Sequence, residues 1–282
     1  MTDTLAAPAW DKAEQLPEDV RAPLRDLILA LADSKRVLGL RYSDRMLGSP
    51  TLEAGIAASS MAQDEWGHAR LTYALLGDLG DEPKALEHER PAAEFRSIAA
   101  LDEDIDGWPG MIAAALLVDS ALSVQYAALL HSRYTPVHNR VQKLLDEERF
   151  HFQYAAGWAR RIAQVPELRG ELAQALGRYL APALAWLGRD DAPNVRRLLE
   201  EGIVSAAPSA LRARFLAKVG PVLSDVGAAE SLGIARDGEG WSHAGTLDWA
   251  GWNDATRRAG GGLDEETAAR ARGDKNRALL MD

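Results

Sequence analysis

The chain has 282 residues, a formal net charge of −10 and no cysteine. The lack of cysteine excludes disulfides, a thiolate nucleophile and a cysteine-based zinc site. The acidic balance, without any basic run, argues against nucleic acid as a partner. Residues 1–19 are polar and lack the apolar core of a secretory signal, so we expect a soluble cytoplasmic protein.

Two long helices are predicted in the N-terminal part of the chain. The first covers residues 24–47, with Pro23 near its first turn and the sequence Gly-Ser-Pro after its end. The second covers residues 51–76. The segment 78–110 that follows is charged and contains three prolines. We expect this segment to form a long crossover between two pairs of helices.

The third predicted helix, over residues 111–133, is unusually apolar. Between residues 111 and 130 the only charged side chain is that of Asp119. A run this apolar is long enough to span a membrane. However, an Asp at the centre of a span costs about 3 kcal/mol, the run is rich in Ala and Ser, and no second span is present to bury the Asp. We therefore expect the central helix of a soluble bundle, without membrane contact.

The remaining helices are shorter, apart from a fourth long one over residues 136–164. Three more are predicted over 168–187 (interrupted by Pro182), 195–203 and 209–226. After residue 233 the chain is expected to be loop-like, except for a polar last helix. No run of residues predicts a strand of convincing length. The fold class is therefore all-α.

Two copies of the motif Glu-x-x-His lie on the second and fourth predicted helices: Glu65 with His68, and Glu148 with His151. Residues three apart share one face of a helix, so each motif presents a carboxylate and an imidazole to the same point. Two such helices, each joined by a helix that carries a further carboxylate, form the di-iron or di-manganese site of ferritin-like proteins. Asp119 on the third helix supplies one of these carboxylates.

The second additional carboxylate is replaced by a lysine. Asp119 precedes Glu148 by 29 residues (148 − 119), and the residue at a similar distance before Glu65 is Lys35 (65 − 35 = 30). Asp33 lies nearby, but it is about 200° round the helix from Lys35 and cannot simply substitute. We expect the two helix pairs to be equivalent, with Lys35 at the position that Asp119 occupies in the other pair.

These features predict a ferritin-like four-helix bundle with additional C-terminal helices. The expected divisions are an N-terminal tail over residues 1–22, the bundle over 23–165, and a helical extension over 166–282 that packs on the bundle.

The sequence resembles the ferritin-like oxygenase subunits of phenylacetyl-CoA epoxidase and of the related benzoyl-CoA epoxidase. The resemblance is close over about residues 27–164 and looser beyond. It is carried by Ser34-Lys35-x-Val37-Leu38-Gly39, Gln63-Asp64-Glu65-x-Gly67-His68, Leu117-Val118-Asp119, Glu148-x-x-His151, Pro182, Leu211-Arg212-x-Arg214-Phe215 and Asp248-Trp249-x-x-Trp252-Asn253.

The resemblance implies a multicomponent oxygenase. In such enzymes a di-iron subunit uses O2 and electrons from a separate reductase to epoxidise the ring of an aromatic acyl-CoA, and a sister subunit of the same fold lacks metal ligands and serves as a structural partner. It implies iron as the cofactor (one or two ions), and the residues that match the metal-ligand positions are Glu65, His68, Asp119, Glu148 and His151. Lys35 stands where the active subunit has Glu. The segment Val37-Leu38-Gly39-x-Arg41 is more similar to the structural sister.

Charge considerations leave three arrangements of Lys35 open. It pairs with the carboxylates and replaces the metals, it swings out and leaves one metal, or a full site forms with an exogenous ligand. Two functions follow: an oxygenase subunit for an aromatic acyl-CoA with a metal site altered by Lys35, which the sequence favours, or a metal-free structural partner in the same complex. Metal storage is a third class, disfavoured by the C-terminal extension. No catalytic residue is assigned.

Overall fold

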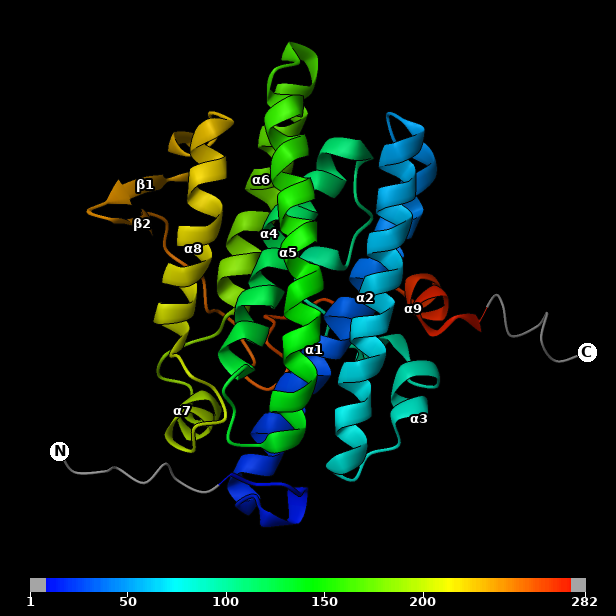
Figure 1. Ribbon diagram of the computed structural model, residues 1–282, viewed down its shortest axis with the longest axis vertical. Helices are drawn as coiled ribbons and strands as arrows, with labels where there is room; N and C mark the ends of the chain where they lie inside the picture. The colour runs from blue at the N-terminus through cyan, green and yellow to red at the C-terminus, as the bar shows by residue number, and fades with distance from the viewer. Residues whose placement is uncertain (1–8, 275–282) are drawn as a thin grey trace, which may run out of the picture.

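The computed structural model describes residues 9–274, and these form a bundle of long helices (Figure 1). They contain nine α-helices and one two-stranded hairpin. The four long helices of the bundle are α1 (Glu18–Arg45), α2 (Leu52–Asp78), α4 (Gly107–Leu129) and α5 (Thr135–Ala163). The ferritin-like, predominantly helical fold class predicted from the sequence is confirmed.

The helices pair as α1 with α2 and α4 with α5. The connection between α1 and α2 is short, a single 3-10 turn over Met46–Gly48 followed by Thr51, whose side chain accepts a hydrogen bond from the backbone N–H of Ala54. This N-cap starts α2 where the sequence predicts it. In contrast, α1 begins at Glu18, inside the predicted tail, because Val20 on its first turn is fully buried and this burial outweighs the helix-start signal of Pro23.

Helix α4 lies in the centre of the molecule, and nearly all its side chains are buried on every side. Within residues 9–274 it is the one helix that is long and apolar enough to cross a membrane, but 94% of that window is buried inside the protein. Its apolar character is thus accounted for by its central place in the bundle.

The crossover from α2 to α4 contains the short helix α3 (Pro83–His88) and the 3-10 turns Ala92–Glu94 and Ala99–Leu101. It is held by Asp33, a fully buried residue on α1. Both carboxylate oxygens of Asp33 accept hydrogen bonds from the guanidinium of Arg90, and the backbone N–H of Arg96 donates to Oδ2 at 2.7 Å. Asp33 therefore faces the crossover, and it does not substitute for Lys35.

Three C-terminal helices pack beside the bundle: α6 (Pro166–Trp186), α7 (Pro193–Glu200) and α8 (Pro208–Asp225). Helices α6 and α8 contact α4, and α7 contacts α1. The expected interruption at Pro182 is wrong, because α6 continues through it. A proline within a helix costs about 3 kcal/mol, and the burial of Leu180 and Leu184 against the bundle offsets this cost.

A β-hairpin follows α8, where the sequence analysis expects loop alone. Strands β1 (Ile234–Asp237) and β2 (Gly240–His243) pair antiparallel, and Gly238 in the turn has φ +59°, a conformation that favours glycine. Trp241 lies against Gly220 of α8 so closely that a Cβ there would approach its ring to 2.4 Å. The last helix, α9 (Glu265–Arg272), is the predicted polar one.

Candidate functional site

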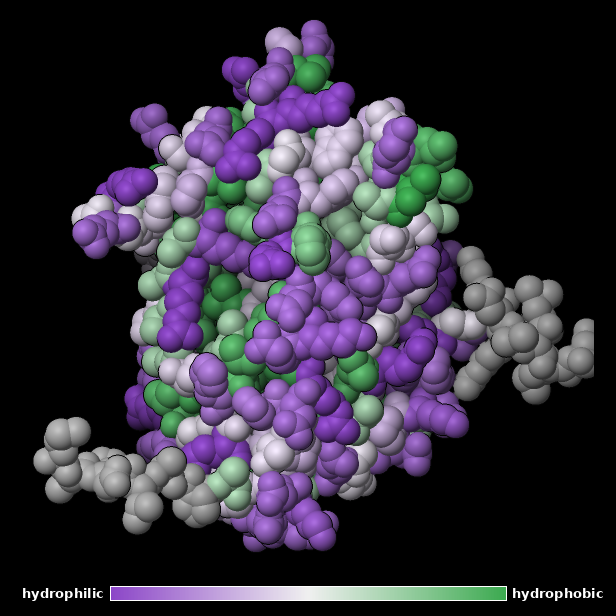
Figure 2. All heavy atoms as spheres, in the orientation of Figure 1, coloured by the Kyte–Doolittle hydropathy of each residue, from purple (hydrophilic) through white to green (hydrophobic). Residues whose placement is uncertain are grey.

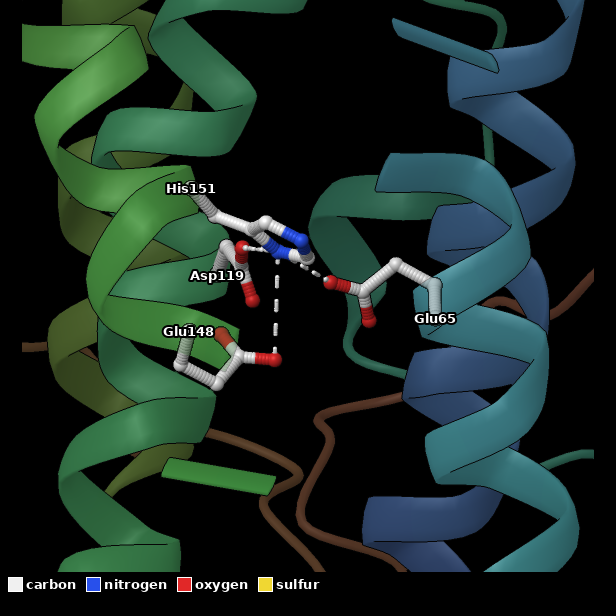
Figure 3. Close-up of side chains that lie close together, drawn as sticks. All are labelled: Glu65, Asp119, Glu148 and His151. Atoms are coloured by element: carbon white, nitrogen blue, oxygen red, sulfur yellow. Dashed lines mark hydrogen bonds and ion pairs between the residues drawn. The ribbon is translucent and has the colours of Figure 1, made fainter. Parts of the chain in front are cut away.

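The structure brings together all six residues that the sequence analysis singled out, in the interior of the bundle. They are Lys35 from α1, Glu65 and His68 from α2, Asp119 from α4, and Glu148 and His151 from α5. Each is at most 3% exposed. Figure 3 shows how Glu65 on one side faces Asp119, Glu148 and His151 on the other. Because the two members of each Glu-x-x-His motif are three residues apart, both point inward from the same turn.

Lys35 lies at the centre of this cluster. Its ammonium nitrogen is 2.6 Å from Oδ1 of Asp119, 2.5 Å from Oε1 of Glu148 and 2.9 Å from Oε2 of Glu65. The geometry corresponds to the first of the three arrangements, in which the lysine pairs with the carboxylates. A buried charge is tolerated only when it is paired, and this ammonium contacts all three acids.

The two histidines are held in a reciprocal manner, each by a carboxylate from the opposite helix. Nδ1 of His68 is 3.0 Å from Oε1 of Glu148, and its Nε2 is 2.7 Å from Glu147. Nδ1 of His151 lies 3.2 Å from Oε1 of Glu65, and its Nε2 lies 3.2 Å from Asp64. Each ring nitrogen of the two histidines therefore lies within 3.2 Å of a carboxylate oxygen.

Three further members of the cluster, Asp64, Glu147 and Ser123, are not predicted as site residues by the sequence analysis. The sequence does carry a signal for the first two, since an acidic residue directly precedes the glutamate of each motif. Ser123 donates a hydrogen bond to Oε2 of Glu148 at 2.8 Å. It lies four residues after Asp119, one helix turn away, so it shares the inner face of α4.

The pKa values of the cluster reflect the competition between burial and pairing. Burial disfavours the charged form of Lys35, but the three carboxylates outweigh it and hold the pKa of Lys35 well above its usual value. For His151, hydrogen bonds to carboxylates outweigh burial and raise its pKa to about 12. Burial alone would raise the pKa of Glu148, but Lys35 and His68 hold this pKa well below its usual range. Burial and the negative charge of Asp119 raise the pKa of Glu65 to about 7.

This arrangement does not fit a two-metal centre. Two divalent ions bridged by carboxylates lie about 3.5–4 Å apart and need several free carboxylate oxygens. Here an ammonium occupies the space between the carboxylates that would bridge them. Ligand atoms of Glu65, Asp119, Glu148 and His151 do lie within 4.8 Å of one another, a set of the type that could hold one metal ion. Such an ion would have to displace the side chain of Lys35.

The fold and the paired motifs define a protein of the ferritin-like class, with a buried cluster of carboxylates and histidines in the bundle. Residues 1–248 match the model of the family described as phenylacetic acid catabolic protein. The chain belongs to this family. It is also similar to one of the subunits of 1,2-phenylacetyl-CoA epoxidase from Escherichia coli (strain K12), with 26% identity over 198 residues, which cover 68% of this chain and 77% of that protein. The resemblance stated from the motifs is confirmed at the level of the family.

Proposed function

We propose that this chain is the metal-free structural subunit of a phenylacetyl-CoA epoxidase-type complex. In that complex it pairs with a metal-bearing subunit of the same fold, which epoxidises an aromatic acyl-CoA with electrons from a separate reductase. The observation that carries the proposal is the position of Lys35, whose ammonium contacts the three carboxylates that would otherwise bind the metals. Similarity to a protein named as an epoxidase subunit supports the complex.

The physical argument concerns what metal binding would require. An incoming Fe(II) must remove the Lys35 ammonium from a fully buried position and release the proton of His151, whose pKa is raised to about 12. Metal ligands bind in their deprotonated forms, so each proton held by the cluster weakens metal affinity. The cluster thus performs by ion pairing the structural task that metal ions perform in a di-iron bundle. No chemical step is assigned to its residues.

A second function has one observation in its favour. The four groups that could hold a single ion support an oxygenase subunit, the function that the sequence analysis favours. In this reading one iron is held after Lys35 swings out. We rank it second because the described residues offer the Lys35 ammonium no comparable set of anionic partners elsewhere along α1.

The metal content of the purified chain distinguishes the two. The chain is produced in iron-supplemented cells, purified without chelators and analysed by inductively coupled plasma mass spectrometry for iron and manganese. We expect only trace metal in the wild type. The matched variant Lys35→Glu, which restores the sixth ligand as a fourth carboxylate, is expected to retain near-stoichiometric iron. Near-stoichiometric iron in the wild type would overturn the structural-subunit proposal in favour of the oxygenase.

A further inference from the structure

A slot on the surface lies between α4, α5 and α8, and its inner end is formed by Ser123 and Glu148 of the ion cluster. Its volume is about 220 Å³. The residues that line it are Ser123, Val124, Ala127, Leu145, Glu148, Arg149, Phe152 and Lys218. In Figure 2, hydrophobic surface is visible in a hollow between the positions that α5 and α8 occupy in Figure 1. The slot is smaller than the 300–1,000 Å³ typical of drug-sized ligands, so its size suits a small molecule.

The feature that distinguishes the slot is Lys218 of α8. This lysine is half-buried, and the structure shows no hydrogen bond or ion pair between it and any other residue in the range 9–274. Its ammonium lies 4.7 Å from the centre of the Phe152 ring, a contact that supplies no negative charge. Burial lowers the pKa of Lys218, and the more distant Asp119 and Glu148 oppose this only in part. A cation in such surroundings gains most from an anionic partner.

The carboxylate of Glu148 at the inner end of the slot does not supply this partner. Its oxygens are already taken by Lys35, His68 and Ser123. At the outer rim, the exposed Arg149 also forms no ion pair within the described part of the chain, and its guanidinium lies over the ring of Phe150. The slot therefore combines apolar walls with two cations that have no anionic partner among residues 9–274.

We propose that this slot binds a small monocarboxylate with an apolar body, such as an arylalkanoate or a short alkanoate. The carboxylate pairs with Lys218, and the apolar body packs against Val124, Ala127 and Leu145. A phosphate fits less well, because it needs several converging donors and offers nothing to apolar walls. The site goes beyond the proposed structural function and does not depend on it, since neither Lys218 nor the apolar walls hold the ion cluster together.

The first test compares two probes on the full-length chain by isothermal titration calorimetry. Phenylacetate carries the required charge, and phenylacetamide has nearly the same shape without it. We expect saturable binding of phenylacetate at one site per chain and binding of phenylacetamide at least about tenfold weaker, because an ion pair is lost. Equal affinities for the two probes, or no binding of phenylacetate, would overturn the proposal.

The second test uses variants of the slot. Lys218→Met keeps the apolar stem and removes the charge, and Ala127→Phe fills the slot. Both should weaken phenylacetate binding at least about tenfold. The matched control Lys143→Met removes an exposed lysine of α5 that does not line the slot, and should leave the affinity unchanged. Lys218→Met is expected to fold, because methionine suits a half-buried position, and circular dichroism verifies this. Unchanged affinity in folded Lys218→Met would place the ligand elsewhere and refute the proposal.

Discussion

Lys35 shows how one residue changes the character of a site. The three acids that contact it would repel one another in a dry interior without a cation. In a di-metal bundle the cations are the metals, whereas here the cation is part of the polypeptide. The negative charges of these three acids are therefore compensated within the polypeptide itself.

Removal of this charge should destabilise the protein strongly. In Lys35→Met the carboxylates of Glu65, Asp119 and Glu148 lose their shared partner, and breaking a buried ion pair costs about 3–5 kcal/mol. Urea unfolding followed by circular dichroism gives the free energy of unfolding. The matched control is Lys84→Met, an exposed lysine on α3, which should change this free energy by less than about 0.5 kcal/mol. Equal stability of Lys35→Met and wild type would mean that the cluster is not held by this ammonium.

Lys35→Glu tests whether the remaining ligands can still bind metal. Without metal this variant should be less stable than Lys35→Met, because a fourth carboxylate adds repulsion. With Fe(II) under anaerobic conditions its melting temperature should rise, since a ligand that binds only the folded state stabilises that state. The wild type should not respond to Fe(II). A variant that gains nothing from Fe(II) would show that the other five groups are not arranged as ligands.

At the scale of elements, charged side chains fix the position of the crossover between α2 and α4 against α1. We call these contacts the anchors of the crossover. Asp33 binds Arg90 of the crossover, and Arg41 of α1 donates to the backbone carbonyls of Leu101 and Asp102. Both α1 residues are at most 1% exposed. An irregular segment has few internal backbone hydrogen bonds, so such contacts with a helix largely determine its position.

Loss of one anchor should therefore loosen the crossover. In Arg90→Met the Asp33 carboxylate remains buried and loses its cation, with an expected cost of about 3–5 kcal/mol. Hydrogen exchange should increase mainly in residues 79–106. The double variant Asp33→Asn/Arg90→Met should be less destabilised than the sum of the single changes, because the uncompensated charge is gone. If the losses in free energy of unfolding of the two single variants simply add up in the double variant, the two side chains are not directly coupled.

The sequence predicts some elements better than others, for physical reasons. Apart from the early start of α1, long helices bounded by Pro, Gly or Thr51 are found close to where they are expected, because these signals are local. The Glu-x-x-His motifs place their side chains together for the same reason. The anchors of the crossover join residues more than fifty positions apart, so no local pattern indicates them. The hairpin is missed because its strands have four residues each, too few for a visible alternation.

At the scale of the whole molecule, the core and the surface have separate roles. The ion cluster is closed inside the bundle, while a patch of large apolar side chains is exposed at the end of the α1–α2 pair. This patch comprises Leu47, Leu52 and Ile56, which are 92%, 76% and 60% exposed. Clustered exposed apolar residues often mark contacts with other proteins. The proposed structural subunit requires such a surface, because its function is to bind another subunit.

We expect this patch to contact the metal-bearing subunit of the same fold. The double variant Leu52→Glu/Ile56→Glu should weaken that complex at least about tenfold in sedimentation velocity experiments, because charges would be buried at the contact. The melting temperature of the double variant, measured without a partner subunit, should equal that of the wild type, since both side chains are exposed in the isolated chain. The matched control is Leu199→Glu on α7, away from the patch, which should leave assembly intact. The wild type is also mixed with each subunit of the same fold that a neighbouring gene encodes. If it stays monomeric in all these mixtures, the proposed assembly is refuted. If it assembles and the double variant assembles equally well, the contact lies on another face of the bundle.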